Sequence, residues 1–446
     1  MKKTLLLTLA IILILYASGS ALANIEFTVK VHQVKETQDS DKKITKDADD
    51  YSMTVDIGDD YFSYTKDGTQ YVYDFTKKRI ITIDLAKKIF ADDSLFSDIG
   101  FRTYEFQNRL MLGGALAAGG VEDNPMLPVY SEHLFSLQQK DNKSELIETS
   151  KDDHVNFTVA DKELLSYSKE GAHVTHANKE MFIKFFRYVF GGHPQILSKL
   201  SIDDNIPERI RIHLYNIMKE INTLTITSIK TTAKKQFSLE NYSPGVLSTD
   251  TEEFSKSLND IKYSKNIDFG GHLALLLSKA KEYYQNQNYI DSILGYLEYS
   301  LASGLPLPPI FQEQKAELMK DGDVNKLLTV LNSKSKEEAE EHLAILQGLE
   351  KKTKYQGHVL KIFEANTLTG LGKQKEAKEL FCEVLKDKPY LVGAYYDLGG
   401  IYYSDYNAVM AWRCWDVARK IDFTHKMLIP INEFETNLLK GYPDFF

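Results

Sequence analysis

The segment EANTLTGLGKQKEAKELFCEVLKDKP, residues 364–389, decides how the second half of the chain folds. Its apolar residues recur at spacings of three and four on either side of a break at Gly372, which is typical of two amphipathic helices joined by a short turn. Small and large side chains alternate along it in a fixed order: Ala365, Leu368, Ala377, Phe381 and Val384, followed by Pro389.

The same order of side chains recurs 34 residues further along the chain. The aligned pairs are Ala365–Gly399, Leu368–Tyr402, Ala377–Ala411, Phe381–Trp415, Val384–Ala418 and Pro389–Phe423. A 34-residue repeat with small and aromatic residues in this order resembles the tetratricopeptide family. The resemblance covers residues 358–424 and extends, with fewer matching positions, to residues 273–304.

Packing explains why these residue types recur. Small residues let two helices approach closely, aromatic residues fill the wedge between helices, and a proline ends one unit before the next. A single helix pair cannot bury its apolar face, so the units must stack. The positions that we expect to pack the repeats are Ala365, Ala377, Phe381, Pro389, Gly399, Tyr402, Ala411, Trp415 and Ala418.

The resemblance to the tetratricopeptide family implies a concave surface that binds a peptide or a partner helix, lined by the first helix of each unit. The matching groove positions are Ile362, Asn366, Thr369, Tyr396 and Tyr403. The alternative is that Tyr396 and Tyr403 are covered by the preceding helices or by the strand-rich domain.

The first half of the chain has the period-two pattern of β-strands. Short alternating segments fill residues 24–95, with turns every nine or ten residues, and Asp67-Gly68 is a strong hairpin signal. Strand patterns return near residues 134–168 and 208–232. A helix with an apolar face is predicted over residues 178–190, and the stretch LGGALAAGG, residues 112–120, is interpreted as a flexible loop or a close-packed helix of small residues.

The strand-rich region resembles the lipoprotein-carrier (LolA-like) half-barrel. The residues that carry this likeness are YFSYTKDGTQYVYDFTKKRIITIDLAKKIF (61–90), RIRIHLYNIM (209–218) and LTITSIKTT (224–232). The resemblance implies a concave face that holds a fatty chain. That face is open in one alternative and filled by the predicted helix in the other, through Phe182, Phe185, Phe186 and Phe190.

Residues 1–23 have the layout of a secretory signal peptide: a basic start, an apolar run and Ala21-Leu22-Ala23 before the cleavage point. No cysteine follows that point, which disfavours a lipid anchor, and the apolar run is too short for a spanning helix. We therefore expect a periplasmic or secreted protein without a membrane span after cleavage. The predicted parts are a strand-rich domain at 24–235, a linker at 236–270 and a helical repeat domain at 271–446.

The composition argues against nucleic acid as a partner, and the cysteines leave open whether a disulfide forms. The formal charge is −9 and no extended basic patch is present, so we expect no binding to nucleic acid. The chain has two cysteines, Cys382 and Cys414. They can form one disulfide between neighbouring units, but we favour two buried thiols.

No pattern of catalytic residues is evident. The mature chain lacks the Gly-x-Ser-x-Gly, His-Glu-x-x-His and Cys-x-x-Cys motifs. His173 and His176 are the best metal candidates, but a segment between a strand and a helix is better explained by solvated or capping histidines. We assign no catalytic, cofactor-binding or metal-binding residues; a hydrolase whose groups converge only in the fold remains a third alternative.

The sequence as a whole predicts an α+β protein. An antiparallel half-barrel or meander with a buried helix is followed by an all-α, tetratricopeptide-like solenoid. The predicted function is non-catalytic protein or peptide binding through the concave face of the solenoid. The alternative is a carrier that holds a hydrophobic small molecule or acyl chain in the half-barrel.

Overall fold

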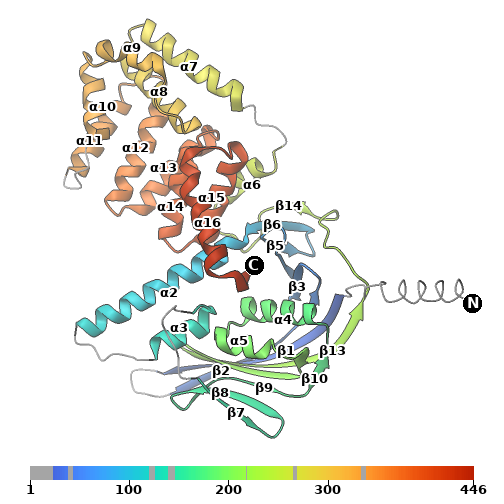
Figure 1. Ribbon diagram of the computed structural model, residues 1–446. Helices are drawn as coiled ribbons and strands as arrows, with labels where there is room; N and C mark the ends of the chain where they lie inside the picture. Colours follow the sequence, from blue (N-terminus) through green and yellow to red (C-terminus); the bar gives the residue numbers. More distant parts are fainter. Residues whose placement is uncertain are drawn as a thin grey trace, which may run out of the picture. The chain divides into compact units, whose positions relative to one another are not determined.

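The computed structural model describes residues 24–38, 44–119, 126–138, 146–216, 218–264, 269–332 and 338–446 (Figure 1). The predicted signal peptide lies outside these residues. The chain divides into two compact units. The sheet unit comprises the chain up to Leu95, Arg102–Ser243 and Tyr442–Phe446, and the helical unit comprises Phe96–Phe101 and Pro244–Gly441.

The predicted fold class is confirmed: an antiparallel sheet precedes an all-helical region. Among the described residues, twelve strands form one open sheet in the order β14-β6-β5-β4-β3-β2-β1-β13-β12-β9-β8-β7, and β10 pairs with β11. The strands are β1 (Asn24–Gln38), β2 (Ile44–Ile57), β3 (Tyr61–Lys66), β4 (Thr69–Asp74), β5 (Arg79–Asp84), β6 (Ile89–Ser94), β7 (Ile147–Lys151), β8 (His154–Val159), β9 (Lys162–Ser168), β10 (Gly171–His173), β11 (Asn205–Pro207), β12 (Arg209–Tyr215), β13 (Lys219–Thr232) and β14 (Ser243–Pro244).

Alternation along the strands sets which face is buried. Phe27, Val29 and Val31 of β1 are at most 2% exposed, whereas Lys30 between them is exposed. The predicted hairpin turn at Asp67-Gly68 is present, with φ of 50° and 76°, the left-handed values that such a turn requires. Strand β1 also pairs along its length with β13, so the sheet joins segments about 190 residues apart.

One face of the sheet is covered by α4 (His176–Val189), together with α3 (Leu127–Phe135) and α5 (Pro194–Leu200) (Figure 1). Thr175 caps α4 by accepting a hydrogen bond from the Asn178 N–H, and Gly191 and Gly192 follow its end with positive φ. The predicted helix is therefore present. Phe182, Phe185 and Phe186 of this helix and Phe190 directly after it are at most 5% exposed.

These four phenylalanines fill the face that the half-barrel resemblance assigns to an acyl chain. The Phe185 ring lies 6.1 Å from that of Phe27 in β1 and 5.6 Å from that of Phe62 in β3, in edge-to-face contacts. The face is therefore packed with this chain's own side chains at α4.

One helix agrees with an alternative given for its sequence, and one differs from the prediction. Of the two alternatives for residues 112–120, the helix is found, because residues 112–118 lie within α2 (Leu95–Ala118), a helix that begins directly after β6. The strand expected near Leu134 is instead the end of α3, which stops at Ser136 in the left-handed conformation. The alternating pattern of the preceding strands masked the change of period at Leu95.

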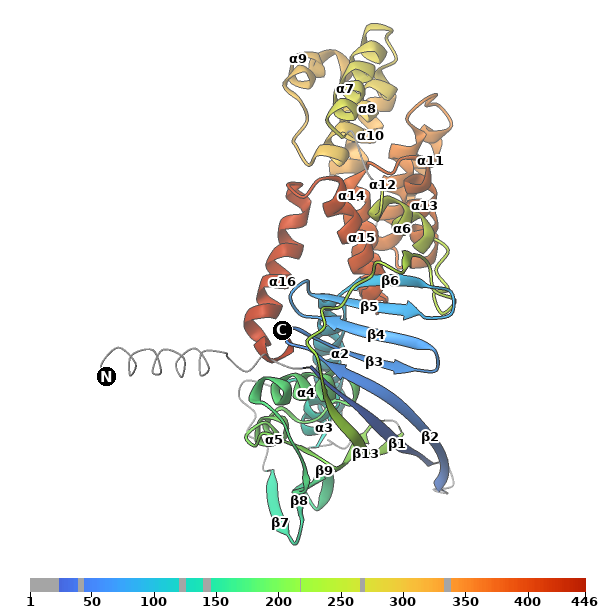
Figure 2. The same ribbon diagram turned by 90° about the vertical axis from the view of Figure 1, so that its right-hand side faces the viewer.

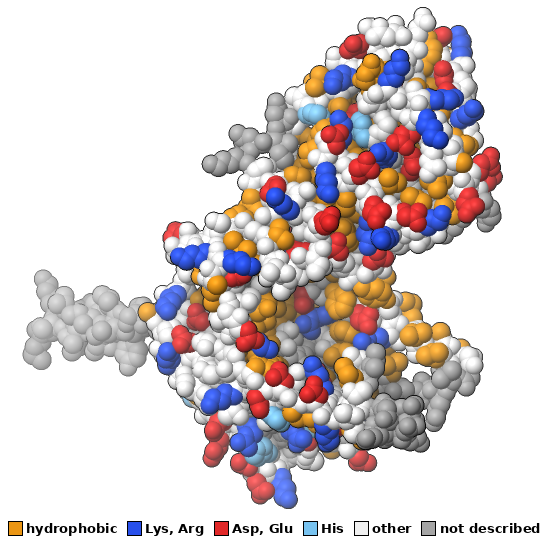
Figure 3. Space-filling model, turned by 180° about the vertical axis from the view of Figure 1, so that it is seen from behind, with side chains coloured by type: hydrophobic (Ala, Val, Ile, Leu, Met, Phe, Trp, Pro, Cys, Tyr) orange, Lys and Arg blue, Asp and Glu red, His pale blue; other side chains and the backbone are white. Residues whose placement is uncertain are grey.

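The helical unit consists of helices that pair in sequence order (Figure 2). No described helix is long and apolar enough to cross a bilayer. In Figure 3 basic and acidic side chains are interspersed over the visible face of this unit. The helices are α6 (Ser255–Lys262), α7 (Phe269–Gln285), α8 (Tyr289–Ser303), α9 (Pro309–Leu318), α10 (Gly322–Asn332), α11 (Ala339–Glu350), α12 (Gly357–Gly370), α13 (Gln374–Asp387), α14 (Val392–Ser404), α15 (Ala408–Ile421) and α16 (Ile429–Gly441), with short 3-10 turns η1 (Lys426–Leu428) and η2 (Pro443–Phe445).

Helices α13 and α15 begin and end 34 residues apart, which follows the sequence repeat. Of the expected packing residues, Ala365, Ala377, Phe381, Gly399, Tyr402, Ala411, Trp415 and Ala418 are buried, and Pro389 is exposed after the end of α13. Pro389 therefore ends a unit without contributing to its core.

Helices α14 and α15 approach each other closely at Gly399. A Cβ on Gly399 would overlap the Trp415 indole. The Trp415 Nε1–H donates to the Tyr396 carbonyl at 3.2 Å, which fixes the ring over the glycine. Neighbouring Gly400 is exposed, and a Cβ there would meet nothing within 4 Å.

This pair of glycines gives a matched test of the packing. We expect Gly399→Ala to lower the free energy of unfolding by about 1–3 kcal/mol, because the added methyl overpacks the indole. Gly400→Ala should leave it unchanged or raise it by up to about 1 kcal/mol through helix propensity. Urea unfolding followed by tryptophan fluorescence measures both; equal effects of the two substitutions would contradict the contact.

Candidate functional site

The groove positions expected on α12 do not share one exposed face. Ile362 is completely buried, so it cannot contact a partner and its assignment is corrected to the core. Asn366 is exposed and donates to Asp397 Oδ2 of α14 at 3.0 Å, while the half-buried Thr369 donates to the Ala365 carbonyl of its own helix. Asn366 therefore links two helices, whereas the bond of Thr369 stays within α12.

The two tyrosines on α14 differ in their surroundings. Tyr396 is half-buried and its carbonyl accepts the Trp415 indole hydrogen bond. Tyr403 donates to the Gly100 carbonyl at 3.0 Å, and its ring packs against Trp412 and Phe434 of α15 and α16 at 5.6 and 5.9 Å. The cover over Tyr403 thus comes from the following helices α15 and α16 and from α2, whereas the alternative named the preceding helices or the strand-rich domain.

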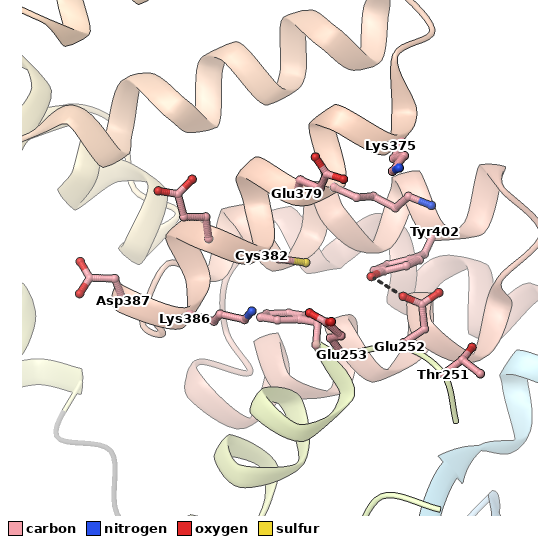
Figure 4. Close-up of a pocket in the computed structure, with 12 residues that line it drawn as sticks. Thr251, Glu252, Glu253, Lys375, Glu379, Cys382, Lys386, Asp387 and Tyr402 are labelled. Carbon is pink, nitrogen blue, oxygen red and sulfur yellow. Dashed lines mark hydrogen bonds between the residues drawn. The ribbon is translucent and has the colours of Figure 1, made fainter. Parts of the chain in front are cut away.

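A groove of about 730 Å³ lies elsewhere in the helical unit, along one side of α13 (Figure 4). One wall is α13 itself, which at 14 residues is about 20 Å long. The other wall is the segment Thr251–Phe254, part of the predicted linker, and Tyr402 of α14 lies between the two walls.

The segment Thr251–Phe254 is held against the helices by polar anchors on both sides. Asp250, just before it, forms an ion pair with Arg413 of α15. Within it, the Glu252 carboxylate accepts from the Tyr402 hydroxyl at 3.4 Å and from the Asn407 side chain at 3.3 Å. Ser255, just after it, donates to Asp250 at 3.0 Å.

Apolar contacts complete the anchoring of the segment. Phe254 is 3% exposed and its ring stacks 6.5 Å from that of Tyr395, while Leu258 of α6 is 2% exposed. This part of the predicted linker is therefore a packed component of the helical unit.

The groove has an apolar floor and a charged rim. Cys382, Phe254 and Tyr402 form the floor, and the Cys382 thiol points from α13 toward the Tyr402 ring (Figure 4). The rim carries five carboxylates against three lysines: Glu252, Glu253, Glu379, Glu383 and Asp387, with Lys375, Lys378 and Lys386. Such a groove suits a short segment with apolar side chains and a positive net charge.

Both cysteines are free thiols, as favoured from the sequence. Cys414 is completely buried, and Cys382 is partly exposed in the groove. Burial raises the pKa of the Cys382 thiol to about 11, so it is mostly protonated at neutral pH and a poor nucleophile. Cys382 therefore contributes mainly surface to the groove, and its thiol reacts only slowly with electrophiles.

Sequence reasoning missed this groove for a definable reason. It placed residues 236–270 in a linker because they are rich in Ser, Asn and Asp. Only the alternation of acidic residues with Phe254 and Leu258 indicated a segment that docks on another surface, and its partners Tyr402 and Arg413 lie about 150 residues away.

The sheet unit holds one deeply buried polar cluster. Glu132 and His193 have no exposed surface, and their side chains lie 3.1 Å apart. The His193 N–H donates to His133 Nδ1 at 2.8 Å, and burial lowers the pKa of His133 to about 3. A substrate has no access to these groups, so the cluster ties α3 to the start of α5.

A second cluster joins helices of the helical unit. Glu298 of α8 is 2% exposed and accepts a hydrogen bond from the Tyr390 hydroxyl, and His358 Nε2 of α12 lies 2.7 Å from the same oxygen. Burial alone would raise the pKa of Glu298, but the contact with His358 outweighs it and lowers that pKa. The arrangement joins α8, α12 and the turn before α14.

The histidines considered as metal ligands do not converge. His173 lies in β10, and His176 begins α4 with its Nδ1 3.0 Å from Asp204. Among the described residues, no group of three or more His, Cys, Asp or Glu side chains could hold a metal ion.

No protein-family model matches the chain, and no curated protein is similar to it. A solved structure titled "Lipid-protein interactions in lipovitellin" aligns at 9% identity with a TM-score of 0.19. The alignment covers 96% of this chain and 56% of that one, so the chain spans little more than half of its length. At that TM-score the match supports no inference about fold or ligand.

The carboxyl of Glu364 on α12 makes stability depend on pH. It is 4% exposed, and burial together with the charge of Glu350 raises its pKa to about 7 from 4.5. A folded-state pKa above the unfolded one means that stability is full below about pH 4.5 and is lost as pH rises toward 7. The buried charge at pH 8 therefore opposes folding.

We expect Glu364→Gln to raise the free energy of unfolding at pH 8 by about 1–3 kcal/mol, from a shift of roughly two pKa units. At pH 4 the variant and the original chain should be equally stable. Chemical denaturation at both pH values measures this, with Glu341→Gln at an exposed site of α11 as the control. A variant that is no more stable at pH 8 would refute the buried charge.

Proposed function

We propose that the protein is an exported, non-catalytic protein-binding module whose helical unit is a tetratricopeptide-like array. It acts in the periplasm or after secretion, once residues 1–23 have been removed. The observation that carries the proposal is the groove along α13, because its apolar floor and charged rim match recognition of a peptide or helix by side chains.

The groove along α13 replaces the concave face as the proposed contact surface. Ile362 is buried and Tyr403 is packed against other helices, which leaves Asn366, Thr369 and Tyr396 as scattered positions. The groove, in contrast, is one helix long and is stiffened by the Asp250–Arg413 pair. The proposed ligand is a short segment with apolar residues and an excess of lysine or arginine.

The carrier alternative is less well supported. The phenylalanines of α4 occupy the concave face of the sheet and contact one another and the strands. A hydrolase is likewise less well supported, because Glu364, which has a raised pKa, does not line the groove along α13.

A substitution that fills the groove tests whether peptides bind there. We expect peptides selected from a random display library against the full chain to be net positive and to bind at micromolar affinity. Cys382→Phe should weaken this binding at least tenfold by occupying the floor, whereas Cys382→Ala, which keeps the groove open, should not. Isothermal titration calorimetry measures the affinities, with circular dichroism to confirm folding.

Two further readouts separate this groove from the concave face. Bound peptide should slow iodoacetamide labelling of Cys382, since Cys414 is buried. Tyr396→Ala should leave the affinity unchanged. Peptide affinity that survives Cys382→Phe but falls with Tyr396→Ala would overturn the assignment to α13.

A further inference from the structure

The residues Asp444, Phe445 and Phe446 pack into the sheet unit and belong to it. They follow α16, and the η2 turn brings them beside α4 (Figures 1 and 2). Phe445 is only 1% exposed although its neighbours Pro443 and Asp444 are exposed. Within η2, Phe445 is thus the buried side chain.

The pocket that receives Phe445 is built from two guanidinium groups and a tyrosine. The Arg187 and Arg102 guanidinium carbons lie 5.1 and 5.7 Å from the centre of the Phe445 ring, within cation–π range. The Tyr188 ring meets it edge-on at 5.4 Å. The pocket therefore selects an aromatic side chain.

Polar side chains of the pocket contact the residues on both sides of Phe445. Arg187 Nη2 lies 3.1 Å from Asp444 Oδ2 as an ion pair. The Tyr188 hydroxyl donates to the Phe445 carbonyl at 2.9 Å, and Lys184 donates to the Phe446 carbonyl. An acid, a buried aromatic and the following backbone are each recognised separately.

The pocket is itself fixed by the sheet unit. Arg102 of α2 donates to the Tyr188 carbonyl at 2.9 Å, and the Tyr188 ring lies 4.9 Å from that of Tyr73 in β4. Arg187 has a side chain only 6% exposed. These contacts come from α2, α4 and β4, so the sheet unit itself positions the residues of the pocket.

We propose that this pocket is a binding site for a short peptide in which an acid is followed by an aromatic and one further residue, which Asp444-Phe445-Phe446 fills from within the chain. The contacts described above come from three consecutive residues, so a free peptide with the same order can make them too. The tethered segment has a high effective concentration and outcompetes a free peptide at comparable affinity. The segment therefore acts as a latch that a partner peptide displaces.

Gly441 gives the segment freedom to leave. It is the last residue of α16, it is exposed, and a Cβ there would meet nothing within 4 Å. Departure would expose Tyr188 and uncover Arg187, whose buried charge would lose its carboxylate partner. The pocket is therefore more stable when it is filled, either by Asp444-Phe445-Phe446 or by a partner peptide.

The experiment compares the intact full chain with a full-length Asp444→Asn, Phe445→Ala variant whose pocket is empty. The probe is a fluorescein-labelled, amidated peptide with the sequence of residues 441–446, and fluorescence anisotropy measures its binding. We expect micromolar affinity for the variant and at least tenfold weaker affinity for the intact chain. A control peptide with alanine at the position of Phe445 should bind the variant at least tenfold more weakly.

A second measurement uses only the intact chain, in case the variant folds poorly. Millimolar peptide should accelerate amide hydrogen exchange within residues 442–446 at least threefold by displacing the latch, and the alanine peptide should not. Equal anisotropy binding by the intact chain and a folded variant would overturn the proposal. So would unchanged exchange of the latch at saturating peptide.

Discussion

The close approach of Gly399 to Trp415 is the contact on which the helical unit and its groove depend. It fixes how α14 and α15 cross, and these two helices carry the anchors of the groove's second wall. Tyr402 on α14 holds Glu252, and Arg413 on α15 holds Asp250. A change in the α14–α15 distance would therefore move the wall relative to α13.

A second constraint acts at the other end of the stack. The Asp291 carboxylate on α8 has no exposed surface and accepts hydrogen bonds from Thr353 and from the backbone N–H groups of Lys354, Tyr355 and Gln356. These groups precede α12, so one carboxylate positions the helix that begins the sequence repeat. Charge-assisted bonds of this kind are stronger than neutral ones, and together they compensate for burying the charge.

The sequence predicted features that depend on local order. Period-two alternation located most strands of the sheet, and the 34-residue interval located the buried small residues of α12–α15. Prediction from the sequence failed where the role of a residue depends on partners far away in the chain. Ile362 and Tyr403 fall at the groove positions that the tetratricopeptide resemblance implied, yet Ile362 is buried and Tyr403 contacts Phe434. The composition around the segment Thr251–Phe254 is typical of a linker. The residues that order it, Tyr402 and Arg413, are far away in the chain, so the sequence pattern did not reveal its packing.

A double-mutant cycle on Gly399 and Trp415 tests the central contact most directly. The cycle combines Gly399→Ala with Trp415→Leu and measures the free energy of unfolding of all four proteins by urea denaturation. If the indole packs on the glycine, the smaller leucine relieves the added methyl and the coupling energy should be about 1 kcal/mol or more. Additive effects, with a coupling energy near zero, would contradict the account.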